Sequence, residues 1–155
     1  MGTLFIRFVE GMKFRNLEQY LLKDISIRTP SGLIKKDRAL TKINGGDEGI
    51  KHVSPGDLVV IIHGKGYFGK SGVVAIGRAT TNCLTYQIDE TTPPLSPTEP
   101  FAVAVESLEW VAGKIPTTKK LRPAIAPYDP TLKLDGPGWR YSTEDLTECI
   151  QDLMK

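Results

Sequence analysis

The chain has 155 residues, 40% of them apolar and 25% charged, which indicates one folded domain over residues 1–155 rather than a disordered chain. Its formal net charge is only +2, so the overall charge does not by itself indicate a polyanion as the partner. No run of about 18 apolar residues and no signal-peptide pattern is present, so we expect no membrane contact.

Short apolar stretches separated by glycine and proline predict a chain dominated by β-strands. Leu58–Ile62 is a continuous run of branched apolar residues, which is typical of a strand that is buried on both faces. The predicted strands are Leu4–Val9, Ser26–Arg28, Leu58–Ile62, Gly72–Thr80, Leu84–Ile88, Phe101–Val105 and Glu109–Val111.

Two helices are predicted, one near each end of the chain. Phe14–Lys23 carries apolar residues at helical spacing. A second helix is expected from about Ser142, whose hydroxyl suits a helix cap, and it would bury Leu146, Ile150 and Leu153.

Several connections are predicted to lack regular structure. Thr29–Val53 is polar, basic and glycine-bearing, and we interpret it as a long surface loop with at most a one-turn helix. We interpret Lys119–Ile125 as extended and Asp129–Gly138, which is rich in proline and glycine, as irregular.

Basic residues gather in three blocks. Arg28–Lys42 holds five basic residues and one acid, whereas His63–Arg78 and Lys114–Arg122 hold basic residues and no acid. A nearly neutral protein with separated basic blocks can still present a basic face to a polyanion. The alternative is that these blocks are solvated loops that serve solubility alone.

The cysteines and histidines give no sign of a metal site. Cys83 and Cys149 form no C-x-x-C pair, and His52 and His63 lie far from both in the sequence. Two isolated thiols are typical of a reducing compartment, so we expect a cytoplasmic protein.

One segment matches the phosphate-binding loop of nucleotide hydrolases. Gly64–Ser71 has the spacing G-x-x-x-x-G-K-[ST], in which Lys70 would reach the terminal phosphates and Ser71 would bind magnesium. Such a loop needs a helix directly after its serine, whereas Gly72–Thr80 predicts a strand. We therefore interpret the segment as a hairpin between two strands and keep nucleotide binding as an alternative.

The second half of the chain follows an order of elements that is similar to a known superfamily. Pro55–Ile62 is a Gly-Asp pair followed by an apolar strand, and Gly72–Thr80 comes next after a glycine-rich hairpin. A proline loop, Phe101–Trp110, Lys114–Pro123 and the terminal helix Ser142–Met154 then follow. Over Val53 to Met154 this order resembles the PUA-like superfamily, in particular its EVE and YTH branches.

The resemblance implies an α+β fold: a curved, mixed β-barrel of five to seven strands flanked by a few helices. It also implies binding to DNA or RNA, with a modified or flipped base as the recognised feature. Some EVE-like domains are target-recognition modules of modification-dependent restriction systems. The resemblance therefore implies an effector protein as well, either fused or separate.

The family places a base-contacting polar residue where this chain has Asn16, although an asparagine there also suits a helix end. The family's cage aromatics have no counterpart in Ile25–Arg28 or Thr91–Pro100.

Other aromatics stand beside basic residues, a combination that suits base stacking and phosphate contact. Tyr67 and Phe68 lie in the glycine-rich hairpin, with burial of Phe68 in the core as the alternative. Trp139 precedes the terminal helix, and packing on that helix is its alternative role. We predict nucleic-acid contacts at Asn16, Arg28, Lys65, Tyr67, Phe68, Lys70, Lys119, Lys120, Arg122, Trp139 and Arg140.

We expect a binding module rather than an enzyme, with no catalytic residue, metal or cofactor. Its expected partner is DNA or RNA with a modified base. The alternatives are a phosphate-loop nucleotide-binding protein that uses Gly64–Ser71 and a protein-interaction module that uses the barrel surface.

Overall fold

The structure is a computed structural model and describes residues 1–8, 22–28, 34–41, 48–63, 72–83, 102–116, 120–134 and 138–155. In 22–28, 34–41 and most of 102–116 the description covers the backbone alone. The elements in chain order are β1 (Thr3–Phe8), β2 (Leu22–Arg28), β3 (Ile34–Thr41), the 3-10 helix η1 (Glu48–His52), β4 (Leu58–His63), β5 (Gly72–Ala79), β6 (Ala102–Pro116), α2 (Arg122–Ile125), β7 (Gly138–Ser142) and α3 (Thr147–Leu153).

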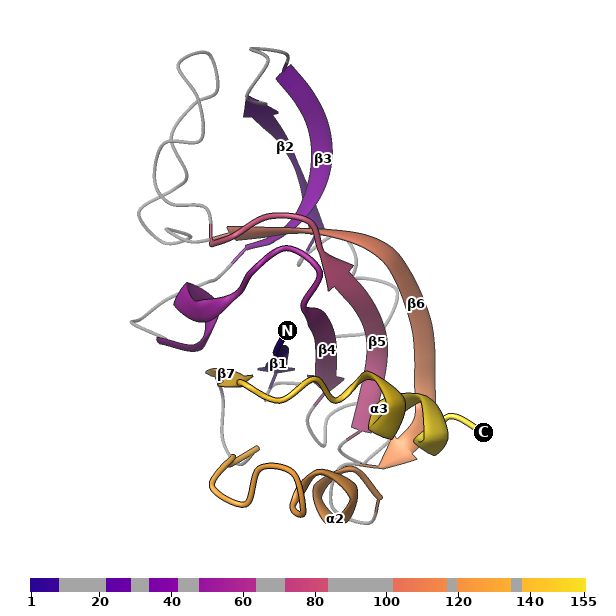
Figure 1. The fold of residues 1–155 in the computed structure, drawn as a ribbon. Coiled ribbons are helices and arrows are strands. Elements are labelled where there is room, and N and C mark those ends of the chain that lie inside the picture. Colours follow the sequence, from indigo (N-terminus) through magenta and orange to yellow (C-terminus); the bar gives the residue numbers. More distant parts are fainter. Residues whose placement is uncertain are drawn as a thin grey trace.

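The strands form one mixed sheet in the order β2-β3-β6-β5-β4-β1-β7. β1 and β4 run parallel, and every other neighbouring pair is antiparallel. Figure 1 shows the sheet curving strongly along β5 and β6. The expected α+β class, the curvature and the upper strand number of seven are therefore confirmed.

Closure of this sheet into a barrel, which we expected, is not found among the described strands. β2 and β7 are the two ends of the strand order, and no pairing joins them there. Among the described strands, the β2–β3 hairpin joins the rest of the sheet through Ala39–Thr41 of β3, which pair with Ala102–Ala104 at the start of β6. The hairpin projects beyond the other strands instead of turning back towards β7 (Figure 1).

The strand β4, which lies between β5 and β1, is buried on both faces, as predicted for Leu58–Ile62. Val59 and Ile61 belong to one hydrophobic cluster, whereas Val60 and Ile62 belong to a second. The split follows from the strand geometry, because successive side chains point to opposite faces of a sheet. Each such buried side chain contributes about 1.5–3 kcal/mol, so this short strand is a major source of stability.

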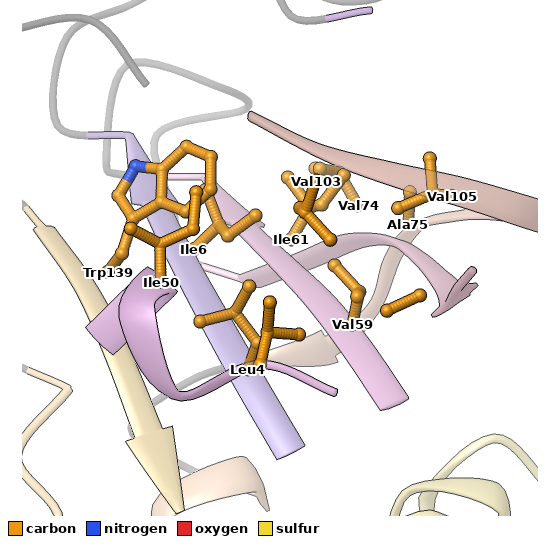
Figure 2. Packing of buried hydrophobic residues seen from close by; sticks show 12 residues of the cluster. Leu4, Ile6, Ile50, Val59, Ile61, Val74, Ala75, Val103, Val105 and Trp139 are labelled. Atoms are coloured by element: carbon orange, nitrogen blue, oxygen red, sulfur yellow. The ribbon is translucent and has the colours of Figure 1, made fainter. Parts of the chain in front are cut away.

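The first cluster is covered by η1 and by the ring of Trp139. Ile50 and Val53 are buried in it, and Figure 2 shows Trp139 beside Ile6 and Ile50 at one end of the cluster. The interpretation of Thr29–Val53 as a surface loop is therefore wrong, because this stretch supplies β3 and two core residues. Only the expected one-turn helix is confirmed, as η1.

The second cluster lies on the opposite face, under α2 and α3. Ile125 of α2 and Ile150 of α3 pack there, together with Leu121 and Leu146, the residues that directly precede the two helices. The interpretation of Lys119–Ile125 as extended is wrong where the structure describes it. Residues four positions apart share one face of a helix, so helical backbone allows both Leu121 and Ile125 to reach the core.

The terminal helix begins later than predicted. Ser142 is the last residue of β7 and pairs with Thr3, and α3 starts only at Thr147. The Ser142 hydroxyl donates to Asp129 Oδ2 at 2.8 Å and accepts the Glu144 amide at 3.2 Å, so it holds a turn between strand and helix. The predicted buried stripe is confirmed, since Leu146 and Ile150 are buried and Leu153 is partly buried.

Asp57 joins three parts of the chain that lie far apart in the sequence. Its buried carboxylate accepts hydrogen bonds from the amides of Gly2 and Ser54, each at 2.9 Å, and from the Tyr141 hydroxyl at 2.7 Å. The turn before it places Gly56 at φ +92, a conformation that favours glycine. The Gly-Asp pair therefore fixes β1, the start of β4 and β7 to one another.

The remaining strand predictions have mixed outcomes. β1 and β5 confirm Leu4–Val9 and Gly72–Thr80 to within a residue. Phe101–Val105 and Glu109–Val111 are parts of the single strand β6, whose pairing with β5 contains two register shifts. β2 extends the strand predicted at Ser26–Arg28 back to Leu22, which contradicts the last two residues of the predicted helix. The rest of that helix and Leu84–Ile88 lie outside the described residues.

Candidate nucleic-acid interface

Four strands of the sheet each have their first or last residue in one row. Phe8 pairs with His63, His63 with Gly72, and Gly72 with Pro116, so these residues lie side by side across β1, β4, β5 and β6. The chain therefore leaves the sheet at the same end after Phe8, between His63 and Gly72, and after Pro116. Figure 1 shows α2 at this end of β6.

Several predicted contacts belong to the segments that leave from this row. They lie outside the described residues, so their interpretation stays a prediction; they are Asn16, Lys65, Tyr67, Phe68, Lys70 and Lys119.

Two of the basic blocks lie at opposite ends of β6. The start of β6 pairs with β3, in the hairpin that holds Arg28, Lys35 and Lys36. The end of β6 leads to Lys120 and Arg122. Figure 1 shows the β2–β3 hairpin beyond the start of β6 and α2 beyond its end. The predicted contact at Arg28 is therefore separate from the predicted contacts near α2.

Basic and aromatic side chains gather around α2. Lys120 and Lys133 are exposed, Arg122 is half-buried, and Tyr128 is 58% exposed. Arg122 and Lys133 line the same hollow, and Asp129, the neighbour of Tyr128, lines it too. We call Lys120, Arg122, Tyr128 and Lys133 the α2 surface.

The backbone under the α2 surface is firmly held. Leu121 and Ile125 anchor it in the second cluster, and the Ile125 carbonyl accepts the amides of Tyr128 and Asp129, both at 3.0 Å. The Asp129 carboxylate accepts the Thr131 hydroxyl at 3.1 Å, besides the bond from Ser142. These contacts present Tyr128 to solvent on a fixed turn, which suits a stacking platform.

The hollow of the α2 surface, which we call the α2 hollow, has a volume of about 150 Å³. Arg122, Asp129 and Lys133 are its charged lining residues. The rest of the lining is apolar and consists of Ile125, Ala126, Pro130, Leu132 and Leu134. An apolar lining with a few charged groups is typical of sites that hold a small organic group.

Trp139 and Arg140 lie in β7 and are not among the residues that line the hollow. The Trp139 side chain is only 5% exposed and packs in the first cluster, so it offers no face to a base in this structure. Its alternative role, packing on the terminal helix, is wrong, because Trp139 belongs to the first cluster and α3 packs on the other face of the sheet. Arg140 is half-buried and stands opposite Phe5 in the pairing with β1.

The thiols and the phenol of the described core are not activated. Burial, the larger effect, raises the pKa of Cys83 despite the nearby Lys51, and burial followed by the charge of Asp152 raises the pKa of Cys149. Burial, then the hydrogen bond and charge of Asp57, raises the pKa of Tyr141 to about 12. A raised pKa leaves less of the nucleophilic anion, so none of these groups is poised for covalent chemistry.

The sequence analysis missed Tyr128 and Lys133. Lys133 falls in Asp129–Gly138, which was interpreted as irregular, and Tyr128 directly precedes it in residues that were assigned to no element; no periodicity draws attention to either residue. The available signal was composition. Tyr128 lies between Pro127 and Pro130, shortly after a basic block, and such proline-rich turns favour exposed side chains.

The residues that follow Gly64–Ser71 do not meet the requirement of a phosphate-binding loop. β5 begins at Gly72 and pairs with both β4 and β6 through its length. A strand there cannot direct the amides of a helix N-terminus towards phosphates. The finding disfavours the nucleotide-binding alternative.

Within the described ranges, no group of three or more His, Cys, Asp or Glu side chains could hold a metal ion. No helix in those ranges is long and apolar enough to cross a membrane. Comparison with protein-family models found no match, and comparison with curated proteins found no similar sequence.

Proposed function

We propose that this protein is a nucleic-acid-binding module of the PUA-like, EVE/YTH type, and that the α2 surface holds the nucleic acid. The observation that carries the proposal is the gathering of three cations and an exposed tyrosine around one anchored turn. Cations hold phosphates without regard to sequence, and an aromatic face stacks on any base. In this proposal the protein binds and does not catalyse.

The charges around α2 favour an anionic partner over a protein partner of mixed charge. Lys120 and Lys133 are exposed, so they contribute to binding a polyanion without a large desolvation cost. The acid among the lining residues of the hollow, Asp129, already accepts hydrogen bonds from Thr131 and Ser142.

The resemblance carries finer features into the proposal. A modified or flipped base is the recognised feature, and an effector protein supplies any further activity. A cytoplasmic location belongs to the proposal too, because a sequence with two isolated cysteines, Cys83 and Cys149, is typical of a reducing compartment. The barrel closure that the superfamily implies would require the chain outside the described strands.

Salt-dependent binding tests the proposal. Fluorescence anisotropy with labelled single-stranded DNA, single-stranded RNA and duplex DNA should show an affinity that falls as salt rises from 50 to 200 mM. Each phosphate contact on a single strand contributes about 0.7 to the slope of log affinity against log salt. Three cations that each contact one phosphate should therefore give a slope of about −2.

Single charge deletions locate the surface. Lys120→Ala and Lys133→Ala should each weaken binding about threefold and lower the salt slope by about 0.7. Lys51→Ala is the matched control, because Lys51 is also exposed but lies on η1, over the opposite face of the sheet. Equal losses in all three variants would show that net charge, and not this surface, is responsible.

A panel of oligonucleotides that carry different base modifications tests the finer part of the proposal. RNA and DNA versions of one sequence should be titrated in parallel. One modification should bind at least about tenfold tighter than the unmodified base if the protein reads it, since a fitted base contact is worth about 1–3 kcal/mol. Uniform affinities across the panel would contradict base-modification recognition while leaving general binding in place.

A further inference from the structure

We propose that the α2 hollow is a subsite for one pyrimidine nucleotide of a single strand, with cytosine preferred. The inference rests on the proposed function and names the feature that the α2 surface would recognise. In this arrangement the base lies on the apolar lining, and the cationic side chains of Arg122 and Lys133 meet the phosphate.

Size favours a single ring. The hollow has a volume of about 150 Å³, and an engineered cavity of roughly this volume in another protein admits benzene. A pyrimidine is one six-membered ring and matches this volume, whereas the second, fused ring of a purine would extend beyond the apolar lining into solvent. The lining residues Ile125, Leu132 and Leu134 supply the apolar contact that an unstacked base needs.

The charged lining residues favour a nucleotide over an uncharged aromatic compound. Arg122 and Lys133 belong to different parts of the turn but line the same hollow. A phosphate attached to a seated base would lie within reach of both, and cations of this kind are the ordinary phosphate contacts of proteins.

Asp129 gives a reason for cytosine over thymine or uracil. Its two oxygens each accept one hydroxyl hydrogen bond, from Thr131 and from Ser142. A carboxylate has about four acceptor positions, so it can still accept from a ligand. Cytosine offers an exocyclic amino group as a donor, and Asp is a recognised partner for it, whereas thymine and uracil offer a carbonyl at that position.

Exposed Tyr128 explains why the strand should be single. It lies beside Asp129 and is 58% exposed, so a base next to the seated nucleotide can stack on its ring. Both the seated base and the stacked base must be free of a complementary strand.

The test compares oligo-dC with an abasic oligonucleotide of the same length, which keeps the phosphates and lacks the bases. Wild-type protein should bind oligo-dC about tenfold tighter than the abasic strand, and oligo-dT and oligo-dA should fall between them. Ala126→Leu fills the hollow from an exposed lining position where the helical backbone accepts leucine. It should remove the preference for oligo-dC and leave abasic binding unchanged.

Ala126→Ser is the matched control, because it changes the same position and keeps its size. It should retain the preference for oligo-dC. Equal binding of oligo-dC and the abasic strand by the wild type, or a preference that survives Ala126→Leu, would overturn the subsite and leave the proposed function standing. Failure of every oligonucleotide to bind would overturn the proposed function itself.

Discussion

Two carboxylates of this protein have opposite uses. Asp57 is buried and accepts hydrogen bonds from three groups of three separate segments, two of them backbone amides. Asp129 is half-buried and accepts from two hydroxyls at the wall of the α2 hollow. The first is enclosed by the fold, and the second still faces a space that a ligand can enter.

The difference shows what the resemblance to the PUA-like superfamily rests on. The Gly-Asp pair that carries much of it, Gly56 and Asp57, holds strands together and does not line the α2 hollow. Its presence therefore indicates a way of joining strands rather than a ligand. The α2 surface, on which the proposed function depends, consists of residues that the resemblance did not single out as a group.

The largest expected effect comes from removing the enclosed carboxylate. Asp57→Ala would leave the amides of Gly2 and Ser54 and the Tyr141 hydroxyl without their acceptor in a buried place. Each orphaned donor costs about 1–3 kcal/mol, so we expect a loss of about 3–5 kcal/mol in the free energy of unfolding, measured by urea denaturation.

Asp152→Ala is the control for that loss. Asp152 is exposed and forms a surface ion pair with Lys155 at 3.4 Å, so its removal should cost less than about 0.5 kcal/mol. Similar losses in the two variants would contradict the structural role of Asp57.

A second prediction concerns the joint between η1 and β7. A Cβ at Gly49 would lie 2.1 Å from the Trp139 carbonyl oxygen and 3.0 Å from the Arg140 amide nitrogen. Backbone atoms cannot give way as a side chain can, so Gly49→Ala should cost about 2–3 kcal/mol in thermal or urea unfolding. Gly56→Ala should cost less, about 1 kcal/mol, because it adds backbone strain and meets only the flexible Met1 side chain. The reverse order would show that η1 is not packed tightly on β7.

The fold was predictable where one local pattern decides the structure. β4 follows from an unbroken run of branched apolar residues, because a strand that is buried on both faces removes all of these side chains from water. β5 follows in the same way, and its β-branched residues excluded the helix that a phosphate loop needs.

The parts that could not be predicted depend on contacts between distant residues. Ile50 is surrounded by polar and glycine residues in the sequence, and its burial depends on Trp139 and Ile6 from other strands. α2 has few residues, and only its contact with the sheet decides between helix and extended chain. The candidate site shares this property, since the turn between Arg122 and Lys133 brings both residues to the lining of one hollow.

A smaller effect is expected at Tyr141, which donates to the enclosed carboxylate from the edge of the molecule. Tyr141→Phe removes one of three donors to Asp57 and should cost about 1 kcal/mol near neutral pH.

The same residue should add a pH dependence at alkaline pH. The pKa of Tyr141 is raised from 10.0 to about 12, so the folded protein keeps a proton that the unfolded chain releases. The stabilisation is complete below pH 10 and is lost as pH rises through 12. Urea unfolding of the wild type should weaken over this window more steeply than that of Tyr141→Phe. Parallel curves would show that Tyr141 is not the group responsible.

The smallest expected effect concerns Glu148, an acidic residue on the helix beside the α2 surface. α3 packs beside α2, with the Cys149 thiol donating to the Ala124 carbonyl at 3.4 Å, and it exposes Glu148. A carboxylate near a surface that holds phosphates opposes binding weakly, because solvent and salt screen it. Glu148→Gln should therefore raise oligonucleotide affinity by about twofold at low salt and leave it unchanged at high salt. Glu109→Gln, an exposed change on β6, should have a smaller effect if the nucleic acid lies at α2, and an equal effect if only net charge matters.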